Sequence, residues 1–286
     1  MSSVSRQKKI GLVIGSGGIK CAAALGMLKV LKREQIAFDL AVGCSGGSLY
    51  AAAIALGWDP EWFAEQTNPM WAGLFTHKSY KNMVKAILPG ILGFNEDFGM
   101  LDDTAINTTL YGVYTNKTFA DTQIPLHIIT TDLMSGASVV LSDGLIADAI
   151  RASIAIPLAL PPKRLGGRLL IDGGASDPLP ISVAMAEGCD LILAMGFEAP
   201  YSPRIGSLMN LIDETSHIIV NNLLRMSFSF YNLEHYSEII SILPTFEHPI
   251  SITDTKEIPY IIGRGELATE EQLPYLHKLL AMNPSL

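Results

Sequence analysis

Two glycine-framed turns near the start of the chain contain residue types that could do chemistry. The first, Gly15–Lys20, reads GSGGIK, and the second, Gly43–Gly47, reads GCSGG. Each follows a short apolar run and opens a segment with helical periodicity. The first turn offers backbone N–H groups that can hold negative charge, and the second can raise a serine hydroxyl at a sharp bend. A nucleophile beside an anion-binding loop supplies most of what an acyl-transfer site needs.

The pattern Gly43-x-Ser45-x-Gly47 fits a nucleophile elbow. In such a turn the serine backbone is strained, and the flanking glycines let strand and helix approach without Cβ clashes. The start of the following helix favours negative charge that develops near the hydroxyl. A serine that only caps the helix, with glycines kept for packing, explains the same residues, and the pattern alone does not separate these two interpretations.

The glycines of the first turn are the candidate oxyanion hole. The amides of Gly17 and Gly18 carry no side chains that would block an ester oxygen. A dinucleotide-binding turn is the rival interpretation, but it needs a third glycine where Lys20 stands. The Gly-Lys-Ser/Thr ending of a phosphate-binding loop is also absent from this turn. The sequence therefore disfavours nucleotide binding.

A serine nucleophile needs a base, and Asp172 is the best candidate. It ends the predicted strand and opens the turn Asp172–Gly174, at a strand end where α/β sites form. Asp132 and Asp143 are weaker alternatives, because one fits a structural strand end and the other a turn with an N-cap. None of the histidines lies in a recognisable catalytic turn, and His127 fits a core histidine. The histidines are His77, His127, His217, His235, His248 and His277.

An aspartate is a weak base for a serine hydroxyl, because the pKa of a free aspartate is about 4. Desolvation would raise the proton affinity of the carboxylate, and an oxyanion hole would lower the demand on it. We therefore expect Asp172 to be partly buried against Ser45.

The elements that must position these residues alternate between strands and helices. Strands are predicted over Lys9–Ile14, Asp39–Gly43, Ile124–Asp132, Ala137–Ser142, Arg168–Ile171 and Asp190–Met195, and helices over 19–31, Leu49–Leu56, 145–151, 180–187 and 205–228. A further helix starts at the Asp59-Pro60 cap. This alternation predicts a three-layer α/β sandwich, with a mainly parallel central sheet covered by helices on both faces. Short helices and loops are expected over 70–120, with exposed aromatic side chains at Trp71, Phe75 and Phe94, and loops are expected beyond Pro244.

Composition bounds the classes of function and partner. The formal net charge of −8 argues against nucleic acid and against docking on anionic lipid by bulk charge. Neither a signal peptide nor a membrane-spanning run is recognised, so we expect a cytoplasmic chain with at most a transient, peripheral contact at a membrane. The cysteines are odd in number and lack metal-ligand spacing, so they fit buried, reduced thiols better than a disulfide framework; they are Cys21, Cys44 and Cys189. The two N-x-T sequons, at Asn107 and Asn116, carry little weight without a secretory route.

Taken in order, the motifs resemble those of patatin-like phospholipases. The resemblance runs from about Lys9 to Met195. It implies Ser45 as nucleophile, Asp172 as base, and Gly17 and Gly18 as oxyanion donors, with no metal or cofactor. The motif-supporting residues are Gly15, Lys20, Gly43, Gly47, Gly173 and Gly174, and further similar stretches are 130–133, 147–153, 156–157 and 177–180. Ser16, which stands where the family usually has glycine, and Lys20-Cys21, which replaces the common Arg-Gly, are departures.

The resemblance implies one patatin-like acyl hydrolase domain over 1–286, with 201–286 as a helical and loop extension packed on it. The expected function is cleavage of fatty-acyl esters of phospholipids or lysophospholipids through an acyl-enzyme. A catalytically weakened lipid-binding or regulatory protein of the same fold is the alternative. A Ser–Asp–His α/β-hydrolase is disfavoured, because too few strands precede Ser45. Residues 70–100 are a candidate lid or interfacial contact (Trp71, Leu74, Phe75, Ile87, Leu88, Ile91, Leu92 and Phe94), and Ile154–Pro162 is a candidate wall of an acyl cleft.

Overall fold

Helices cover both faces of a central sheet in the computed structural model, which describes residues 8–75, 98–101, 103–198, 205–206, 208–231 and 237–281. Within these ranges the strands are β1 (Ile10–Ile14), β2 (Leu40–Cys44), β3 (Leu126–Asp132), β4 (Ser138–Leu141), β5 (Lys163–Leu165), β6 (Arg168–Asp172), β7 (Leu191–Met195) and β8 (Glu238–Ile242). The α-helices are α1 (Ala23–Arg33), α2 (Gly46–Ala55), α3 (Pro60–Phe75), α6 (Asp103–Tyr114), α7 (Ile146–Ser153), α8 (Ile181–Ala186), α9 (Leu208–Tyr231), α10 (Ile258–Glu270) and α11 (Leu273–Ala281). Short 3₁₀ helices are η1 (Gly18–Ala22), η2 (Phe119–Asp121), η3 (Gly173–Ala175) and η4 (Thr255–Glu257).

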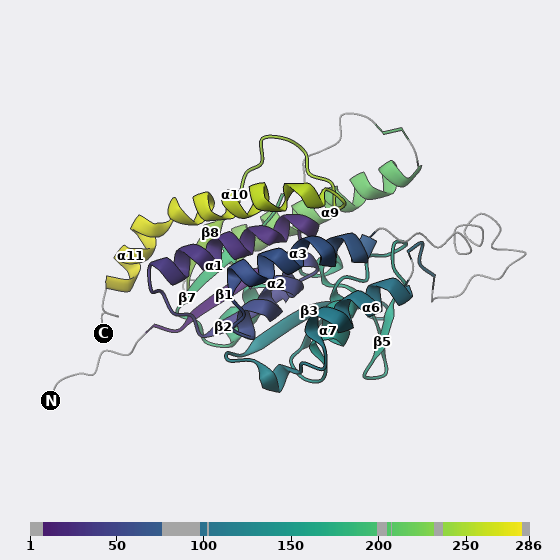
Figure 1. The fold of residues 1–286 in the computed structure, drawn as a ribbon, viewed down its shortest axis with the longest axis horizontal. Coiled ribbons are helices and arrows are strands. Elements are labelled where there is room, and N and C mark those ends of the chain that lie inside the picture. Colours follow the sequence, from purple (N-terminus) through teal and green to yellow (C-terminus); the bar gives the residue numbers. More distant parts are fainter. Residues whose placement is uncertain are drawn as a thin grey trace, which may run out of the picture.

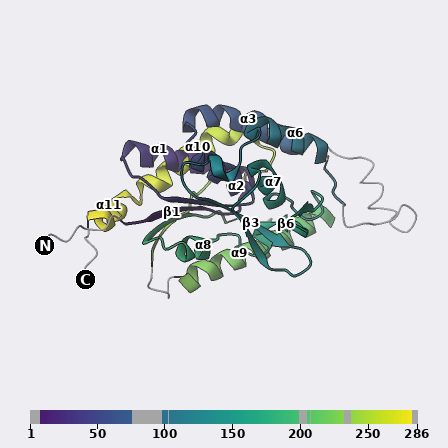
Figure 2. The same ribbon diagram turned by 90° about the horizontal axis from the view of Figure 1, so that it is seen from below.

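The three predicted layers are confirmed. Viewed along the edge of the sheet in Figure 2, α1, α2, α3, α6, α7 and α10 lie on one side, and α8 and α9 lie on the other. The strand order is β5-β6-β3-β2-β1-β7-β8, and β4 also pairs with β3. Neighbouring strands are parallel along the part of this path that runs β3-β2-β1-β7-β8. The pairings of β4 and β6 with β3, and of β5 with β6, are antiparallel. The sheet is therefore mainly parallel with an antiparallel end.

The central strands are buried along their whole length because helices cover them on both faces. Every residue of β1, β2 and β7 is buried. Their sequences, IGLVI, LAVGC and LILAM, are the continuous apolar runs that such strands require. All ten residues of α2 are also buried, and its alanines let it lie close to β2. This buried centre carries both glycine-framed turns at its edge.

The C-terminal part differs from the prediction of loops beyond Pro244, which is wrong. Helices α10 and α11 follow there, and α10 lies along α1 (Figure 1). Strand β8 was not predicted either, and it pairs in parallel with β7. The expected long helix is present as α9, over Leu208–Tyr231.

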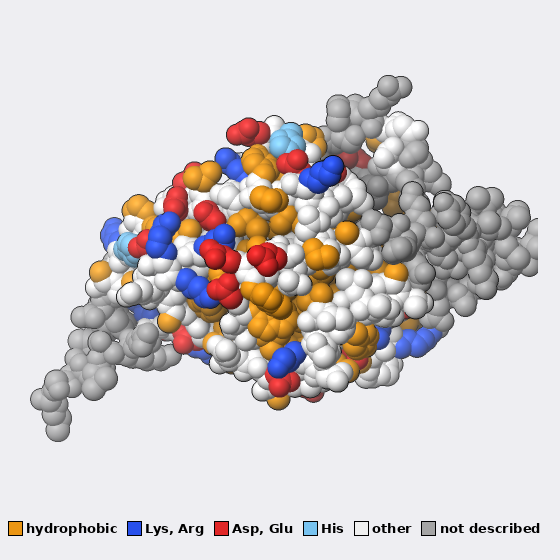
Figure 3. All heavy atoms as spheres, in the orientation of Figure 1, with side chains coloured by type: hydrophobic (Ala, Val, Ile, Leu, Met, Phe, Trp, Pro, Cys, Tyr) orange, Lys and Arg blue, Asp and Glu red, His pale blue; other side chains and the backbone are white. Residues whose placement is uncertain are grey.

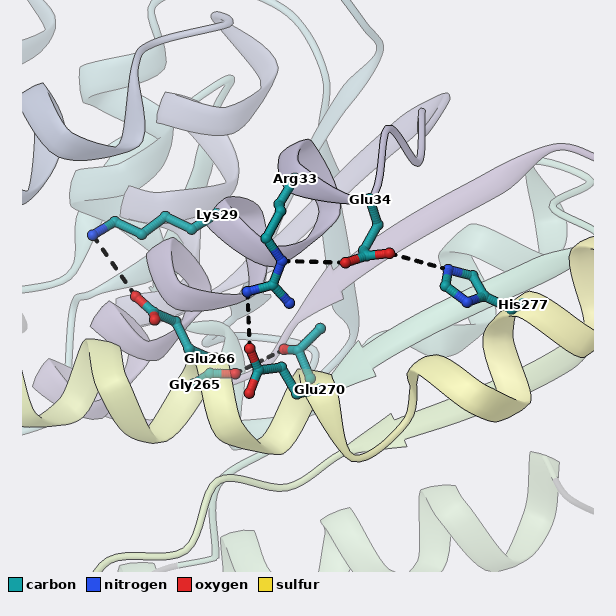
Figure 4. Close-up of polar contacts among 8 residues, drawn as sticks. Lys29, Arg33, Glu34, Gly265, Glu266, Glu270 and His277 are labelled. Atoms are coloured by element: carbon teal, nitrogen blue, oxygen red, sulfur yellow. Dashed lines mark hydrogen bonds and ion pairs between the residues drawn. The ribbon is translucent and has the colours of Figure 1, made fainter.

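Helices α1 and α10 pack at close range through two glycines. A Cβ atom on Gly265 would lie 2.0 Å from the carbonyl oxygen of Ala23, and one on Gly26 would lie 2.1 Å from that of Ile262. Acidic and basic side chains gather over these helices on the molecular surface (Figure 3). Arg33, for example, pairs with Glu34 at 3.2 Å and with Glu270 at 2.9 Å (Figure 4). The backbone contact rather than these exposed ion pairs should set the stability of the helix pair.

The expected lid lies largely outside the described residues, which omit Ile87, Leu88, Ile91, Leu92 and Phe94. Its two described side chains, Trp71 and Leu74, are buried core residues of α3. The expectation that Trp71 is exposed is therefore wrong: its indole Nε1 donates to the hydroxyl of Tyr50 at 2.8 Å. In the described part of the chain, none of the helices has both the length and the apolar character needed to cross a membrane. The three cysteines are buried and free, as predicted.

Candidate active site

Ser45 lies at the bend between β2 and α2, with the strained backbone that the elbow pattern predicts. Its φ is 53° and its ψ is −129°, a conformation that residues with a Cβ atom rarely adopt. The neighbouring glycines are required by space, because a Cβ on Gly43 would lie 2.6 Å from Cα of Ser48. A Cβ on Gly47 would lie 2.3 Å from the carbonyl oxygen of Ile14. The tight packing of β1, β2 and α2 therefore holds the serine in this conformation.

Asp172 meets Ser45 as expected. The Ser45 hydroxyl donates to Oδ2 of Asp172 at 2.7 Å, and the Gly174 amide donates to Oδ1 at 2.7 Å. Both side chains are buried, with relative exposures of 4% for Ser45 and 6% for Asp172. Burial raises the pKa of Asp172 to about 6, and the hydrogen bonds from Ser45 and Gly174 oppose part of this rise. The carboxylate is thus a stronger base than a solvated aspartate.

Strand β3 brings the two residues together. Cys44 of β2 pairs with Ile129, and Asp172 of β6 pairs with the next residue, Thr130. Because β4 occupies the opposite flank of β3 over Ile128–Thr131, β2 and β6 share one flank and meet there end to end. Asp172 lies at the end of its strand, as predicted, but β6 runs antiparallel to β3 and reaches Ser45 from the direction opposite to that of β2.

The first turn lies directly beside the elbow. The amides of Gly15 and Ser16 donate to the carbonyl oxygens of Met195, at 2.9 Å, and Pro178, at 2.7 Å. A Cβ on Gly46, the residue after Ser45, would lie 2.4 Å from the carbonyl oxygen of Gly18. The loop and the nucleophile turn are therefore in backbone contact.

The glycines of the first turn are needed for different reasons. Gly18 has a φ of +58°, in the left-handed region that favours glycine. Gly17 has extended φ, but a Cβ there would lie 2.4 Å from the ring of Phe197. Lys20 follows in η1, and its ammonium donates to the carbonyl oxygen of Glu198 at 3.3 Å. Burial lowers the pKa of Lys20.

The alternative bases lie elsewhere. Asp132 accepts the amide of Met134 at 2.9 Å and serves its own turn. Asp143 does not cap α7 as expected, because the N-cap is Leu145. His127 on β3 contacts Glu187 at 3.1 Å. His217 is exposed on α9, while His248 and His277 pair with Glu257 and Glu34, and His77 and His235 lie outside the described residues.

Comparison with known proteins matches the part of the chain that contains these motifs. The sequence model described as patatin-like phospholipase matches residues 12–185. The chain belongs to the patatin-like phospholipase family. It is 28% identical over 188 residues to "Patatin-like phospholipase domain-containing protein 6" of Mus musculus, covering 65% of this chain and 13% of that protein. It is 30% identical over 191 residues to an uncharacterized NTE family protein of Mycobacterium bovis, covering 67% of this chain and 49% of that protein.

The patatin-like fold is also shared with a solved structure. VipD from Legionella pneumophila matches with a TM-score of 0.50 and 15% sequence identity, covering 94% of this chain and 67% of that chain. A likeness at this identity concerns the fold alone. The chain spans less than half of the length of the mouse and mycobacterial relatives.

Sequence reasoning gave no role to Ser153, although the structure places it at the site. The hydroxyl of Ser153 accepts the backbone N–H of Ser45 at 2.9 Å. The stretch containing Ser153 resembles the patatin-like pattern, but nothing in the sequence shows that a serine at the end of a helix meets a turn 108 residues earlier.

Proposed function

We propose that this patatin-like phospholipase is a serine acyl hydrolase that cleaves fatty-acyl esters of phospholipids or lysophospholipids. One observation carries the proposal: the buried Ser45 hydroxyl donates to the buried Asp172 carboxylate at 2.7 Å, beside a glycine loop. The family match supports a lipid ester as the substrate class. The proposed substrate is therefore a lipid, which the protein reaches through transient contact with a membrane surface.

The proposed reaction begins with attack by Ser45. Asp172 takes the hydroxyl proton as Oγ of Ser45 bonds to the ester carbonyl carbon. The amides of Gly17 and Gly18 donate to the resulting oxyanion, with support from the N-terminus of α2, which starts at Gly46. Collapse breaks the bond to the leaving alkoxide, which receives the proton from Asp172, and an acyl-enzyme remains.

Deacylation repeats these steps with water. Asp172 takes one proton from the water molecule as its oxygen attacks the acyl carbon. The tetrahedral intermediate then releases the fatty acid, and the proton returns to Oγ of Ser45. The scheme needs no metal or cofactor. The acyl chain would lie along Ile154–Pro162, which follows α7 and leads to β5.

A lipid-binding protein without turnover is the alternative, and Ser16 in the first turn motivates it. The hydroxyl of Ser16 lies close to the Asp172 turn, since a Cβ on Gly174 would be 2.9 Å from Ser16 Oγ and 3.1 Å from Asp172 Oδ1. The direct contact between Ser45 and Asp172 favours the hydrolase, because a carboxylate with a raised pKa beside a serine hydroxyl has a catalytic use.

A fluorophosphonate probe separates the two candidates. The hydrolase predicts covalent labelling of the parent chain and of Ser216→Ala, whose serine is exposed on α9, but not of Ser45→Ala. It also predicts release of fatty acid from defined phospholipid or lysophospholipid micelles by the same two labelled proteins. A parent chain that binds these lipids but neither labels nor releases fatty acid would favour the binding protein.

A further inference from the structure

We propose that Ser153 is a positioning residue that holds the Ser45 turn in its reactive conformation, an inference that rests on the proposed function. Ser153 is the last residue of α7 and has a relative exposure of 0%. Its hydroxyl accepts the Ser45 amide at 2.9 Å and donates to the carbonyl oxygen of Ile129 at 2.6 Å. A single buried hydroxyl thus joins the elbow to strand β3.

The Ser45 amide needs such a partner because of its place in the fold. Strand pairing between β2 and β3 ends at Cys44, one residue before it. The first four amides of a helix have no acceptor within the helix itself. Ser45 lies one residue before the start of α2, so its amide is in the same position. A buried amide left without a partner costs about 1–3 kcal/mol. The Ser153 hydroxyl therefore satisfies a donor that the strained turn cannot satisfy locally.

The chain that follows Ser153 also holds the base. The Asp172 amide donates to the carbonyl oxygen of Ala155 at 3.0 Å. Two positions of one segment, Ser153 and Ala155, thus bind the backbones of Ser45 and Asp172. The C-terminal end of α7 thereby sets the separation of the two side chains, which come from strands that meet end to end on β3.

Ser48 provides a contrast. Its hydroxyl donates to the Ser45 carbonyl at 2.6 Å, but it lies one turn along the same helix, so the bond is local. Such a bond can follow the elbow when the elbow moves. The bond from Ser153 crosses from another helix and can hold the elbow against the sheet.

The test compares Ser153→Ala with Ser153→Thr, which keeps the hydroxyl, and with Thr269→Val. Thr269 is buried in α10, and its hydroxyl donates to the Gly265 carbonyl at 2.7 Å, so this control removes a buried hydroxyl far from Ser45. We expect kcat for Ser153→Ala to fall by about 10–100-fold with KM within about twofold, because displacement of a reacting group by about 1 Å costs roughly that much. Ser153→Thr and Thr269→Val should keep kcat within about threefold.

Amide hydrogen exchange gives a readout that does not depend on turnover. The Ser45 amide should be protected in the parent chain and in Ser153→Thr, and should exchange at least about tenfold faster in Ser153→Ala. Fluorophosphonate labelling of Ser45 should slow in the same variant.

Three outcomes contradict the positioning role: a folded Ser153→Ala with parental kcat, an unchanged exchange rate of the Ser45 amide in Ser153→Ala, or an equal loss of kcat in Ser153→Ala and Ser153→Thr. If Ser153→Ala does not fold, a loss of kcat or of Ser45 protection in folded Ser153→Thr contradicts the role as well. A parent chain that is neither labelled by the fluorophosphonate nor able to hydrolyse the ester contradicts the proposed function instead. Hydrogen exchange of the Ser45 amide in Ser153→Ala then shows whether Ser153 holds the turn.

Discussion

Gly46 and Gly18 touch through their backbones: a Cβ atom on Gly46 would lie 2.4 Å from the carbonyl oxygen of Gly18 and 2.9 Å from its Cα. This contact joins the first glycine loop to the residue that follows Ser45. The geometry between the proposed nucleophile and the proposed oxyanion donors therefore depends on a distance that any side chain at position 46 would lengthen.

Gly46→Ala should cause a large loss of activity. The added methyl group must push the loop away, at a cost of about 1–3 kcal/mol in stability, and we expect kcat to fall by roughly 100-fold. Gly112→Ala is the matched control, because nothing lies within 4 Å of a Cβ on this exposed helical glycine. It should raise the free energy of unfolding by about 0.5–1 kcal/mol and leave hydrolysis unchanged. Parental kcat in Gly46→Ala would argue against the proposed oxyanion loop.

Activity should fall at acidic pH. The proposed base works only as a carboxylate, and burial raises the pKa of Asp172 to about 6. The value of kcat/KM should therefore rise tenfold per pH unit up to about pH 6 and level off above it. Initial rates of ester hydrolysis between pH 4.5 and 8 measure this limb. An acid limb centred near pH 4 would contradict the raised pKa of Asp172.

Asp172→Asn should be inactive but more stable than the parent at neutral pH. Because the folded pKa lies above the ordinary value of 3.8, the native state binds the proton more tightly, and stability falls as pH rises from about 4 to 6. The ionised carboxylate then costs on the order of 3 kcal/mol above pH 6, which the neutral amide avoids. Urea unfolding at pH 5 and pH 8 measures this difference.

Asp177→Asn is the control for that experiment. Burial also raises the pKa of Asp177 to about 6, but its carboxylate contacts Ser182 rather than Ser45. This variant should show a similar gain in stability at pH 8 while keeping hydrolysis within about threefold. A stability gain of Asp172→Asn limited to pH 5 would contradict the raised pKa of Asp172. Activity in Asp172→Asn close to that of Asp177→Asn would contradict the role of Asp172 as the base.

The contact between α1 and α10 should be sensitive to a single methyl group. Gly265→Ala places that group 2.0 Å from the carbonyl oxygen of Ala23, so we expect a loss of about 3 kcal/mol or more in the free energy of unfolding. Gly263→Ala, in the same helix with nothing within 4 Å, should stabilise by about 0.5–1 kcal/mol. Glu270→Gln should change stability by less than about 0.5 kcal/mol, since its ion pair with Arg33 is exposed. Chemical denaturation of the three variants checks this order, and equal stabilities for the two alanine variants would contradict it.

The sequence predicted the parts of the site that depend on local chemistry. Gly43, Gly47 and Gly18 mark positions where neighbouring backbone or a positive φ excludes other residues, and such positions leave a visible pattern. The aspartate after a strand was likewise visible. The antiparallel direction of β6 was not, because a short apolar run carries no information about which way it pairs.

The missed elements depend on contacts made at long range. Ser153 becomes informative only when α7 lies against the elbow. Helix α10 contains Gly263 and Gly265, which weaken its helical signal, and the second of these is explained by its contact with Ala23 of α1. Strand β8, a short run at 238–242, is specified by its pairing with β7.

The end-to-end meeting of β2 and β6 on β3 has a consequence for biosynthesis. Ser45 and Asp172 are 127 residues apart in the chain, so a ribosome completes the elbow long before it delivers the carboxylate. Until β6 docks, the proposed nucleophile at position 45 lacks the hydrogen bond to its proposed base. Under the proposed function, enzymatic competence therefore arises late in synthesis, together with the tertiary assembly of the sheet.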